Sequence, residues 1–196
     1  MYTGYMKLGG VIAGSVIGLV AIFGLINYAD AAVDMFLKVE NIANQAPIEG
    51  ESTTEGYENW IDILSVSWGV SNPAPIISGG GGGAGKASFS DFNFVKKTDK
   101  SSPKLFLAVA KGEVLPSANF HVTDLIGAKV TPYIIFNLDK VRVTSYSISG
   151  AEGTDRPTES LSLNFAKVQY EYSSFDKAGK ASKTTATWSL EDNAGQ

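Results

Sequence analysis

The sequence predicts a mainly β fold, in which a tight β-barrel carries one short α-helix and follows an N-terminal hydrophobic segment. Three observations predict it. Apolar and polar residues alternate in most segments after residue 32, as expected for half-buried strands. Two long strand patterns, at 133–149 and 161–172, change the face of their apolar residues midway. One segment alone carries helix start and stop signals.

The changes of face indicate strongly bent strands. The apolar residues of 133–149 change parity after Leu138 and change back at Tyr146, and those of 161–172 change parity after Phe165. A slip of one residue turns every side chain to the opposite face, and a β-bulge absorbs the extra residue while bending the strand. Bent strands suit a small, tightly coiled barrel.

The remaining elements are expected in this order: strands at 33–40, 59–70 and 87–95, a helix at about 103–111, and a hairpin at 174–182 with its turn at Asp176–Gly179. Ser102 is the expected helix cap, Pro103 the first helical residue, and Gly112 the end signal. Because Leu105 and Val109 share one face, we expect the helix to plug one side of the barrel.

The hydrophobic segment "LGGVIAGSVIGLVAIFGLI" covers residues 8–26 and contains no charged residue. Lys7 precedes it, and the small residues of "ADA" (29–31) follow it. This arrangement is typical of an export signal that is cleaved between Ala31 and Ala32.

A retained membrane anchor is the alternative interpretation of the same segment. The run approaches the roughly 20 residues that cross a bilayer. Gly10, Gly14 and Gly18 recur every four residues, which permits close packing of membrane helices. We therefore expect residues 1–31 to be a signal peptide or a membrane anchor, and 32–196 to be the β-barrel domain. Contact with a membrane is expected only through 1–31.

Composition excludes several classes of function. The chain of 196 residues has a net charge of −4, so there is no basic excess for nucleic acid. Its only basic cluster, Lys96-Lys97, is expected to be a solvated end of the strand on which Phe92 and Phe94 face the core. Cysteine is absent and His121 is the single histidine, so no thiolate nucleophile or histidine-rich metal site is expected. His121 is expected to be an ordinary strand residue.

The segment "SGGGGGAGKASF" (78–89) contains most of a phosphate-binding loop. Such a loop requires a strand before it and a helix after it. Two prolines precede the glycines, a strand pattern follows Lys86, and Ala87 stands where a hydroxyl should bind magnesium. We therefore expect no nucleotide or other cofactor, and interpret the segment as a mobile or closely packed loop. Its glycines are Gly79, Gly80, Gly81, Gly82, Gly83 and Gly85.

No catalytic constellation is expected either. The carboxylates show no recognisable pairing; they include Asp62, Asp91, Asp99, Asp139, Glu159 and Glu171. The polar segment "TDRPTES" (154–160) is best interpreted as a turn between two long strands.

Several segments, in order, together resemble the haemolysin-coregulated protein (Hcp) family: "AVDMFLKVE" (32–40), "IEGES" (48–52), "IDILSVSWG" (61–69), and the segments within 79–105 and 145–172. The resemblance implies two β-sheets in a tight barrel with one helix, and six copies in a ring. It implies that rings stack into the inner tube of a type VI secretion system, which a contractile sheath drives outward beneath a spike protein. Effector cargo can ride in the lumen, and the family has no catalytic residues.

Two features depart from the family pattern. The apolar segment precedes Ala32, and "NIANQAP" (41–47) lengthens one connection. The expected function is that of a structural ring and tube subunit; the alternative is an exported or anchored ring, tube or binding module outside a contractile machine. The expected location is secreted or periplasmic after cleavage, with membrane-anchored, or cytoplasmic until secretion, as alternatives. The glycine loop and the 41–58 loop are the candidates for ring-to-ring contact.

Overall fold

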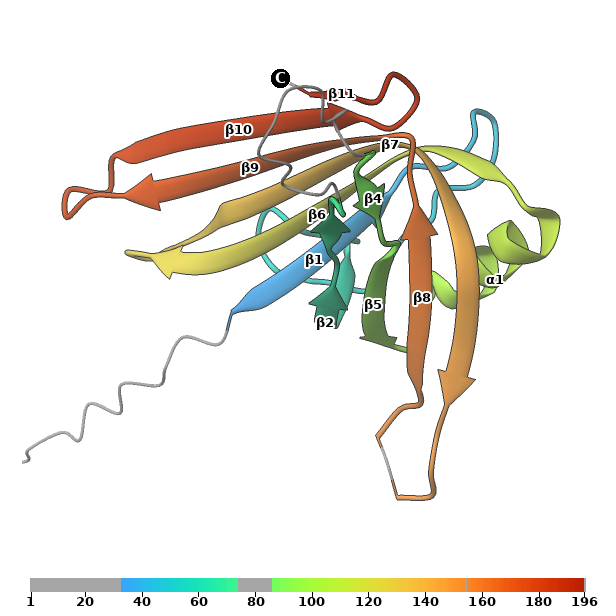
Figure 1. Ribbon diagram of the computed structural model, residues 1–196. Coiled ribbons are helices and arrows are strands. Elements are labelled where there is room, and N and C mark those ends of the chain that lie inside the picture. Colours follow the sequence, from blue (N-terminus) through green and yellow to red (C-terminus); the bar gives the residue numbers. More distant parts are fainter. Residues whose placement is uncertain (1–32, 74–85, 154, 196) are drawn as a thin grey trace, which may run out of the picture. The chain divides into compact units, whose positions relative to one another are not determined.

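The computed structural model describes residues 33–73, 86–153 and 155–195, which form eleven strands and one helix (Figure 1). The elements are β1 (Asp34–Val39), β2 (Ile61–Ser67), β3 (Val70–Ser71), β4 (Ser88–Phe89), β5 (Phe92–Lys97), α1 (Ser102–Lys111), β6 (Val114–Ile126), β7 (Lys129–Ser149), β8 (Thr158–Asn164), β9 (Lys167–Phe175), β10 (Ala181–Ser189) and β11 (Ala194–Gly195). Within this part of the chain, no helix is long and apolar enough to cross a membrane.

Six antiparallel strands close into a barrel. The nine-stranded sheet has the order β11-β10-β9-β7-β6-β1-β2-β5-β8, and β8 also pairs with β7. The second pairing closes a circle through β7, β6, β1, β2, β5 and β8, while β9, β10 and β11 extend outside it. The expected barrel with one short helix is confirmed. The expected division into two sheets is wrong, because the 21-residue strand β7 belongs to both the barrel and the extension.

The bend of β7 explains how one strand serves both parts. Ile134–Asp139 pair with β9, and Arg142–Ser149 pair with β8. Lys140 lies between them with φ 50°, a left-handed conformation that changes the direction of the strand. A register shift between Val143 and Ser145 marks the second irregularity. The two parity changes inferred from the sequence are therefore confirmed, although the first arises from a left-handed residue rather than an inserted one.

Helix α1 begins and ends close to the expected residues. Leu105 and Ala108 are fully buried against the barrel core, and Val109 packs beside them. Gly112 ends the helix with φ 63°, and its amide donates to the carbonyls of Ala108 and Val109. The residue at the N-cap position is Ser101, not Ser102 as expected, and its side chain makes no capping hydrogen bond.

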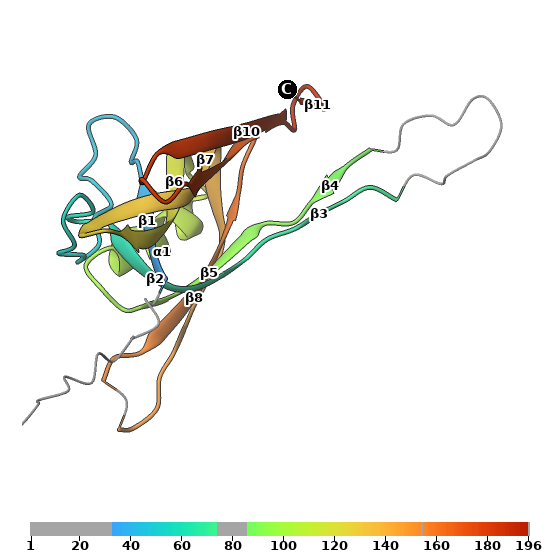
Figure 2. The same ribbon diagram turned by 90° about the vertical axis from the view of Figure 1, so that its left-hand side faces the viewer.

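Strands β3 and β4 form a short hairpin that continues the β2–β5 pair away from the barrel (Figure 2). Val70 pairs with Phe89, and Ser71 with Ser88. The residues after Lys86 thus form a strand and not the helix that a phosphate-binding loop requires. The glycines Gly79 to Gly83 and Gly85, and the expected cleavage site at Ala31 and Ala32, lie outside the described residues.

His121 lies on a strand, and the hairpin expected at 174–182 is present, as the sequence predicts. His121 is on β6, directly opposite Phe36 of β1, and its Nδ1 lies 3.0 Å from the Tyr57 hydroxyl. The turn from Asp176 to Gly179 joins β9 to β10, with a 2.9 Å hydrogen bond from the Gly179 amide to the Asp176 carbonyl. The short strand β11 follows β10, so β10 is not the last strand.

Candidate functional site

A fully buried lysine lies at one end of the barrel. The Nζ atom of Lys96 on β5 lies 2.8 Å from Oδ1 of Asp99 and 2.8 Å from Oε2 of Glu159. It also donates to Oγ of Ser102 at 3.0 Å. We call Lys96, Asp99, Ser102, Tyr146 and Glu159 the Lys96 cluster. Such a cluster is expected whenever a charge is buried, because an unpaired ammonium group in the core would lose several kcal/mol of hydration.

Strand register brings the two charges of this cluster together. Lys96 and Glu159 are directly opposite each other in the β5–β8 ladder, and both side chains point into the barrel. Glu159 also accepts hydrogen bonds from Ser102 Oγ at 2.8 Å and from the Tyr146 hydroxyl at 2.7 Å. Burial would raise the pKa of the Glu159 carboxyl, but the hydrogen bonds from Lys96, Tyr146 and Ser102 outweigh it and hold this pKa below its usual range.

Tyr146 keeps its proton in this environment. Burial, followed by the hydrogen bond to Glu159, raises the pKa of its hydroxyl to about 12. The hydroxyl is therefore a permanent donor to the carboxylate at physiological pH. The Glu159 oxygens accept hydrogen bonds from Lys96, Ser102 and Tyr146, and the side chain has no exposed surface.

The same cluster fixes the entry into α1. The Ser101 amide donates a hydrogen bond to Asp99 Oδ1 at 2.9 Å, and the Asp99 amide donates one to Ser102 Oγ at 3.0 Å. Ser102 therefore does not cap the helix as expected; its hydroxyl bonds the preceding turn and Glu159 instead. The turn between β5 and α1 is held in place by the buried charges.

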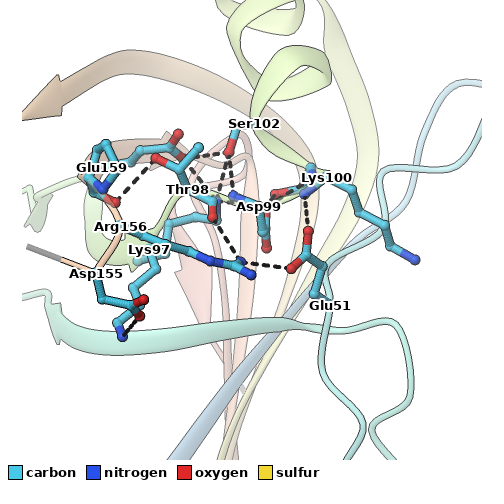
Figure 3. A network of polar contacts seen from close by, with 12 residues as sticks. Glu51, Lys97, Thr98, Asp99, Lys100, Ser102, Asp155, Arg156 and Glu159 are labelled. Atoms are coloured by element: carbon cyan, nitrogen blue, oxygen red, sulfur yellow. Dashed lines mark hydrogen bonds and ion pairs between the residues drawn. The ribbon is translucent and has the colours of Figure 1, made fainter.

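A set of exposed ion pairs continues from this cluster across three loops (Figure 3). Arg156 Nη1 lies 2.8 Å from Glu51 Oε2, and the Lys100 amide donates to Glu51 Oε1 at 3.1 Å. Lys97 pairs with Asp155 at 3.1 Å. The hydrogen bond from Arg156 holds the pKa of Glu51 below its usual range. Exposed pairs of this kind are weakened by solvent screening, so they orient the loops more than they stabilise the fold.

The sheet outside the barrel has an apolar face that packs against the barrel core at one end and is exposed at the other, within the described residues. Cross-strand pairing places three rows on this face: Leu138–Val168–Trp188, Phe136–Tyr170–Ala186 and Ile134–Tyr172–Thr184. Exposure rises outward along β9, from 3% at Val168 to 39% at Tyr170 and 45% at Tyr172. We call the outer two rows the aromatic shelf. It is anchored by Phe136 and Tyr170, whose rings stack at 4.5 Å.

One strand edge next to the shelf is also open. Strand β10 pairs with β9 over its whole length, whereas β11 covers only Trp188 and Ser189 on its other side. Among the residues that the structure describes, 181–187 therefore have no strand partner on that side. Figure 1 shows β9 and β10 extending from the barrel alongside β6 and β7. An open edge beside a partly exposed apolar face is a surface suited to another protein chain.

Two expectations about charged residues are wrong. Lys96 is not a solvated strand end, since it has no exposed surface, whereas Lys97 is exposed as expected. The carboxylates were expected to lack pairing, yet Asp99 and Glu159 share the Lys96 ammonium group. The turn expected within 154–160 is confirmed for 155–157, but Glu159 lies inside the barrel on β8.

A six-stranded antiparallel barrel with an open strand edge is an architecture typical of a structural protein that contacts other chains. The family described as "Type VI secretion system effector, Hcp" matches residues 36–172, so the chain belongs to the Hcp family of type VI secretion system tube and effector proteins, which are structural and non-enzymatic. Protein hcp1 of Pseudomonas aeruginosa is 37% identical over 141 residues, which cover 72% of this chain and 83% of that protein.

Solved structures are similar over most of the chain. The structure described as "Structure of a type six secretion system protein" has a TM-score of 0.75 and 32% identity, covering 84% of this chain and all of the other. Hcp1 from Salmonella typhimurium has a TM-score of 0.66 and 27% identity, covering 84% of this chain and 99% of the other. The resemblance inferred from the sequence segments is thereby confirmed.

Proposed function

We propose that copies of this chain close into hexameric rings, and that the rings stack into the inner tube of a type VI secretion apparatus. The observation that carries the proposal is the open edge of β10 beside the aromatic shelf. Residues 181–187 leave backbone donors and acceptors unpaired in the described part of the chain, and Tyr170 and Tyr172 leave apolar surface in water. A neighbouring copy satisfies both at once, and closure of a ring leaves no copy with a free edge.

The rim loops support stacking. The 41–58 segment reaches the end of the barrel where Glu51 binds Arg156 and the Lys100 amide. Its backbone is also fixed to the start of β2, because the Ser52 amide donates to the Trp60 carbonyl and the Asn59 amide to the Ser52 carbonyl. A loop held in one conformation loses little entropy when it contacts a second ring. The glycine loop is the second candidate, and it lies outside the described residues.

The partners follow from the family and are part of the proposal: other copies of the chain, a spike protein, a contractile sheath, and effector cargo in the lumen. Secretion would then occur through the type VI machine itself. No nucleic acid or cofactor is required by this function.

Measurement of solution mass tests the proposal. The purified chain is examined by light scattering and native mass spectrometry across a dilution series, without nucleotide or metal. A discrete species of six chains supports the ring, and longer assemblies at high concentration support stacking. A strict monomer at every concentration would reject autonomous ring formation.

A second candidate function rests on the uncharged run at 8–26. We infer that residues 1–31 act as an export signal or anchor, so that the domain works as an exported or anchored ring, tube or binding module outside a contractile machine. Mass spectrometry of the protein from its native host identifies the N-terminal residue and distinguishes a cleaved export signal from a retained anchor. A chain that begins at Ala32 favours the exported module, and an intact chain in the membrane fraction favours the anchor.

A further inference from the structure

A pocket lies on the opposite face of the sheet from the aromatic shelf, away from the β10 edge that is proposed to join neighbouring copies. Residues 55–57 of its lining belong to the 41–58 segment that is proposed to contact a second ring. Its volume is about 630 Å³, within the range of small-molecule sites. It lies between the 55–60 segment and the turn that joins β6 to β7, and its wall is made of Tyr57, Trp60 and His121. Glu55 and Lys129 also line it.

The aromatic wall is rigid. Tyr57 is buried and stacks on Phe36 with ring centroids 4.2 Å apart. Its ring meets Trp60 edge-on at 5.0 Å, and Trp60 lies 4.8 Å from the His121 ring. These contacts hold the three rings against one another, so a ligand cannot insert between them and must stack on their outer surface. Trp60, which is only partly buried, offers that surface.

The pocket is lined by one negatively charged and one positively charged side chain. Burial lowers the pKa of His121, so the imidazole is neutral at physiological pH. Burial also raises the pKa of Tyr57 to about 12, which keeps its hydroxyl protonated beside His121 Nδ1. The carboxylate of Glu55 and the ammonium group of Lys129 are therefore the pocket's two charges. Neither forms an ion pair with any residue in the described ranges.

We propose that this pocket binds a zwitterionic aromatic amino acid. The ring of the ligand stacks on Trp60, its carboxylate meets the Lys129 ammonium, and its own ammonium group meets the Glu55 carboxylate. An offset or edge-on contact between two aromatic rings adds a favourable interaction to the burial of apolar area. Opposite charges on the ligand match the two unpaired charges of the pocket, whereas a ligand with a single charge would leave one of them without a partner.

The test uses the full chain and L-phenylalanine, followed by titration calorimetry and by saturation-transfer NMR of the ligand ring. We expect saturable binding in the millimolar range or tighter. Trp60→Leu should weaken binding about three- to ten-fold, because it removes the stacking surface. Lys129→Gln and Glu55→Gln should each weaken it about two- to five-fold, as for exposed ion pairs. Lys177→Gln, on the exposed β9–β10 turn, is the matched control and should bind as the unaltered chain does.

Two analogues test the charge assignment separately. 3-Phenylpropionate lacks the amine and should lose the effect of Glu55→Gln, while phenethylamine lacks the carboxylate and should lose the effect of Lys129→Gln. The thermal unfolding midpoint of each variant shows whether the pocket is still folded. No saturable binding to the unaltered chain, or equal affinity for the ligand in Trp60→Leu with an unchanged midpoint, would overturn the proposal. Equal affinity for all three ligands would overturn the assigned roles of Glu55 and Lys129.

Discussion

The Lys96 Nζ atom lies 2.8 Å from Glu159 Oε2, and neither side chain has any exposed surface. The two residues are 63 positions apart in the chain, and they meet because β5 and β8 pair in one particular register. A slip of one residue in either strand would turn the charge of that strand out of the core and separate it from its partner. The ion pair therefore ties the closure of the barrel to a single register.

Removal of the lysine charge is the first prediction. Lys96→Met should lower the free energy of unfolding by about 3–5 kcal/mol, because Glu159 would keep a buried charge without its cation. Lys97→Met, on the exposed neighbour, should change it by no more than about 1 kcal/mol. Urea denaturation of both variants is the measurement.

The double variant Lys96→Met/Glu159→Leu separates pairing from packing. We expect it to recover most of the lost stability, since two apolar side chains in the core need no partner. If the double variant is as unstable as the sum of its single changes, the pair is not energetically coupled and the interpretation is wrong.

Stability should also depend on pH through Glu159. The usual pKa of this carboxyl is 4.5 and its folded value is lower, so the unfolded chain takes up the proton first as pH falls. The stabilisation is therefore complete above about pH 4.5 and is lost as pH falls through the folded pKa. The free energy of unfolding, measured from neutral pH downward, should fall in that window.

The variant Glu159→Gln identifies the group responsible. It should be less stable at neutral pH and show a shallower decline in acid, whereas Glu152→Gln, on an exposed turn, should retain the slope of the unaltered chain. An unchanged acid slope in Glu159→Gln would assign the effect to other carboxylates.

Part of the Lys96 cluster could be predicted from the sequence. Phe92, Phe94 and Lys96 share one parity, as do Glu159, Leu161 and Leu163, so both charged residues occupy positions that face the core. A lysine at a strand end is usually solvated, and this expectation outweighed the parity. The missing information was the β5–β8 register, which arises from pairing over a long sequence separation and leaves no local signal.

The aromatic shelf could be predicted only as a set of apolar residues. Val168, Tyr170 and Tyr172 alternate with more polar residues, which predicts a strand with one face in the core. The structure shows that β9 leaves the barrel, so that Val168 is buried and Tyr172 is nearly half exposed. The chain turns at Lys140 and at residues 165–166. The single bent strand expected at 161–172 is two strands, β8 and β9, because the chain leaves the barrel between them.

A charge on the shelf should prevent ring formation. Tyr172→Lys places an ammonium group on the face that a neighbouring copy would cover, and an unpaired charge in such an interface is strongly unfavourable. Ser147→Lys, at an exposed position of β7 opposite Ser160 of β8 and away from both the shelf and the β10 edge, is the matched control. Light scattering should show a monomer for the first and the same assembly as the unaltered chain for the second. Assembly of both variants would exclude the shelf from the subunit contact.

A charge in the N-terminal apolar run tests the proposed role of residues 1–31. Ile17→Arg should cost roughly 2.5–3.5 kcal/mol at a bilayer midplane, so export or anchoring should fail and the chain should stay in the cytoplasm. Fractionation of cells that express each form is the measurement. Ser15→Ala, which keeps the run uncharged, should localise as the unaltered chain does. If Ile17→Arg leaves the location unchanged, the segment is neither signal nor anchor.

Deletion of Gly80–Gly83 tests the glycine loop as a ring-to-ring contact. Ser71 and Ser88 pair across the β3–β4 hairpin, so the two ends of the loop are already adjacent and a shorter loop can still close. The barrel should therefore keep its thermal unfolding midpoint and single rings should remain, while stacks become shorter or disappear in electron micrographs. Rings that fall apart would place the loop between subunits of one ring instead. Stacks of undiminished length would leave the 41–58 segment as the remaining candidate for the contact between rings.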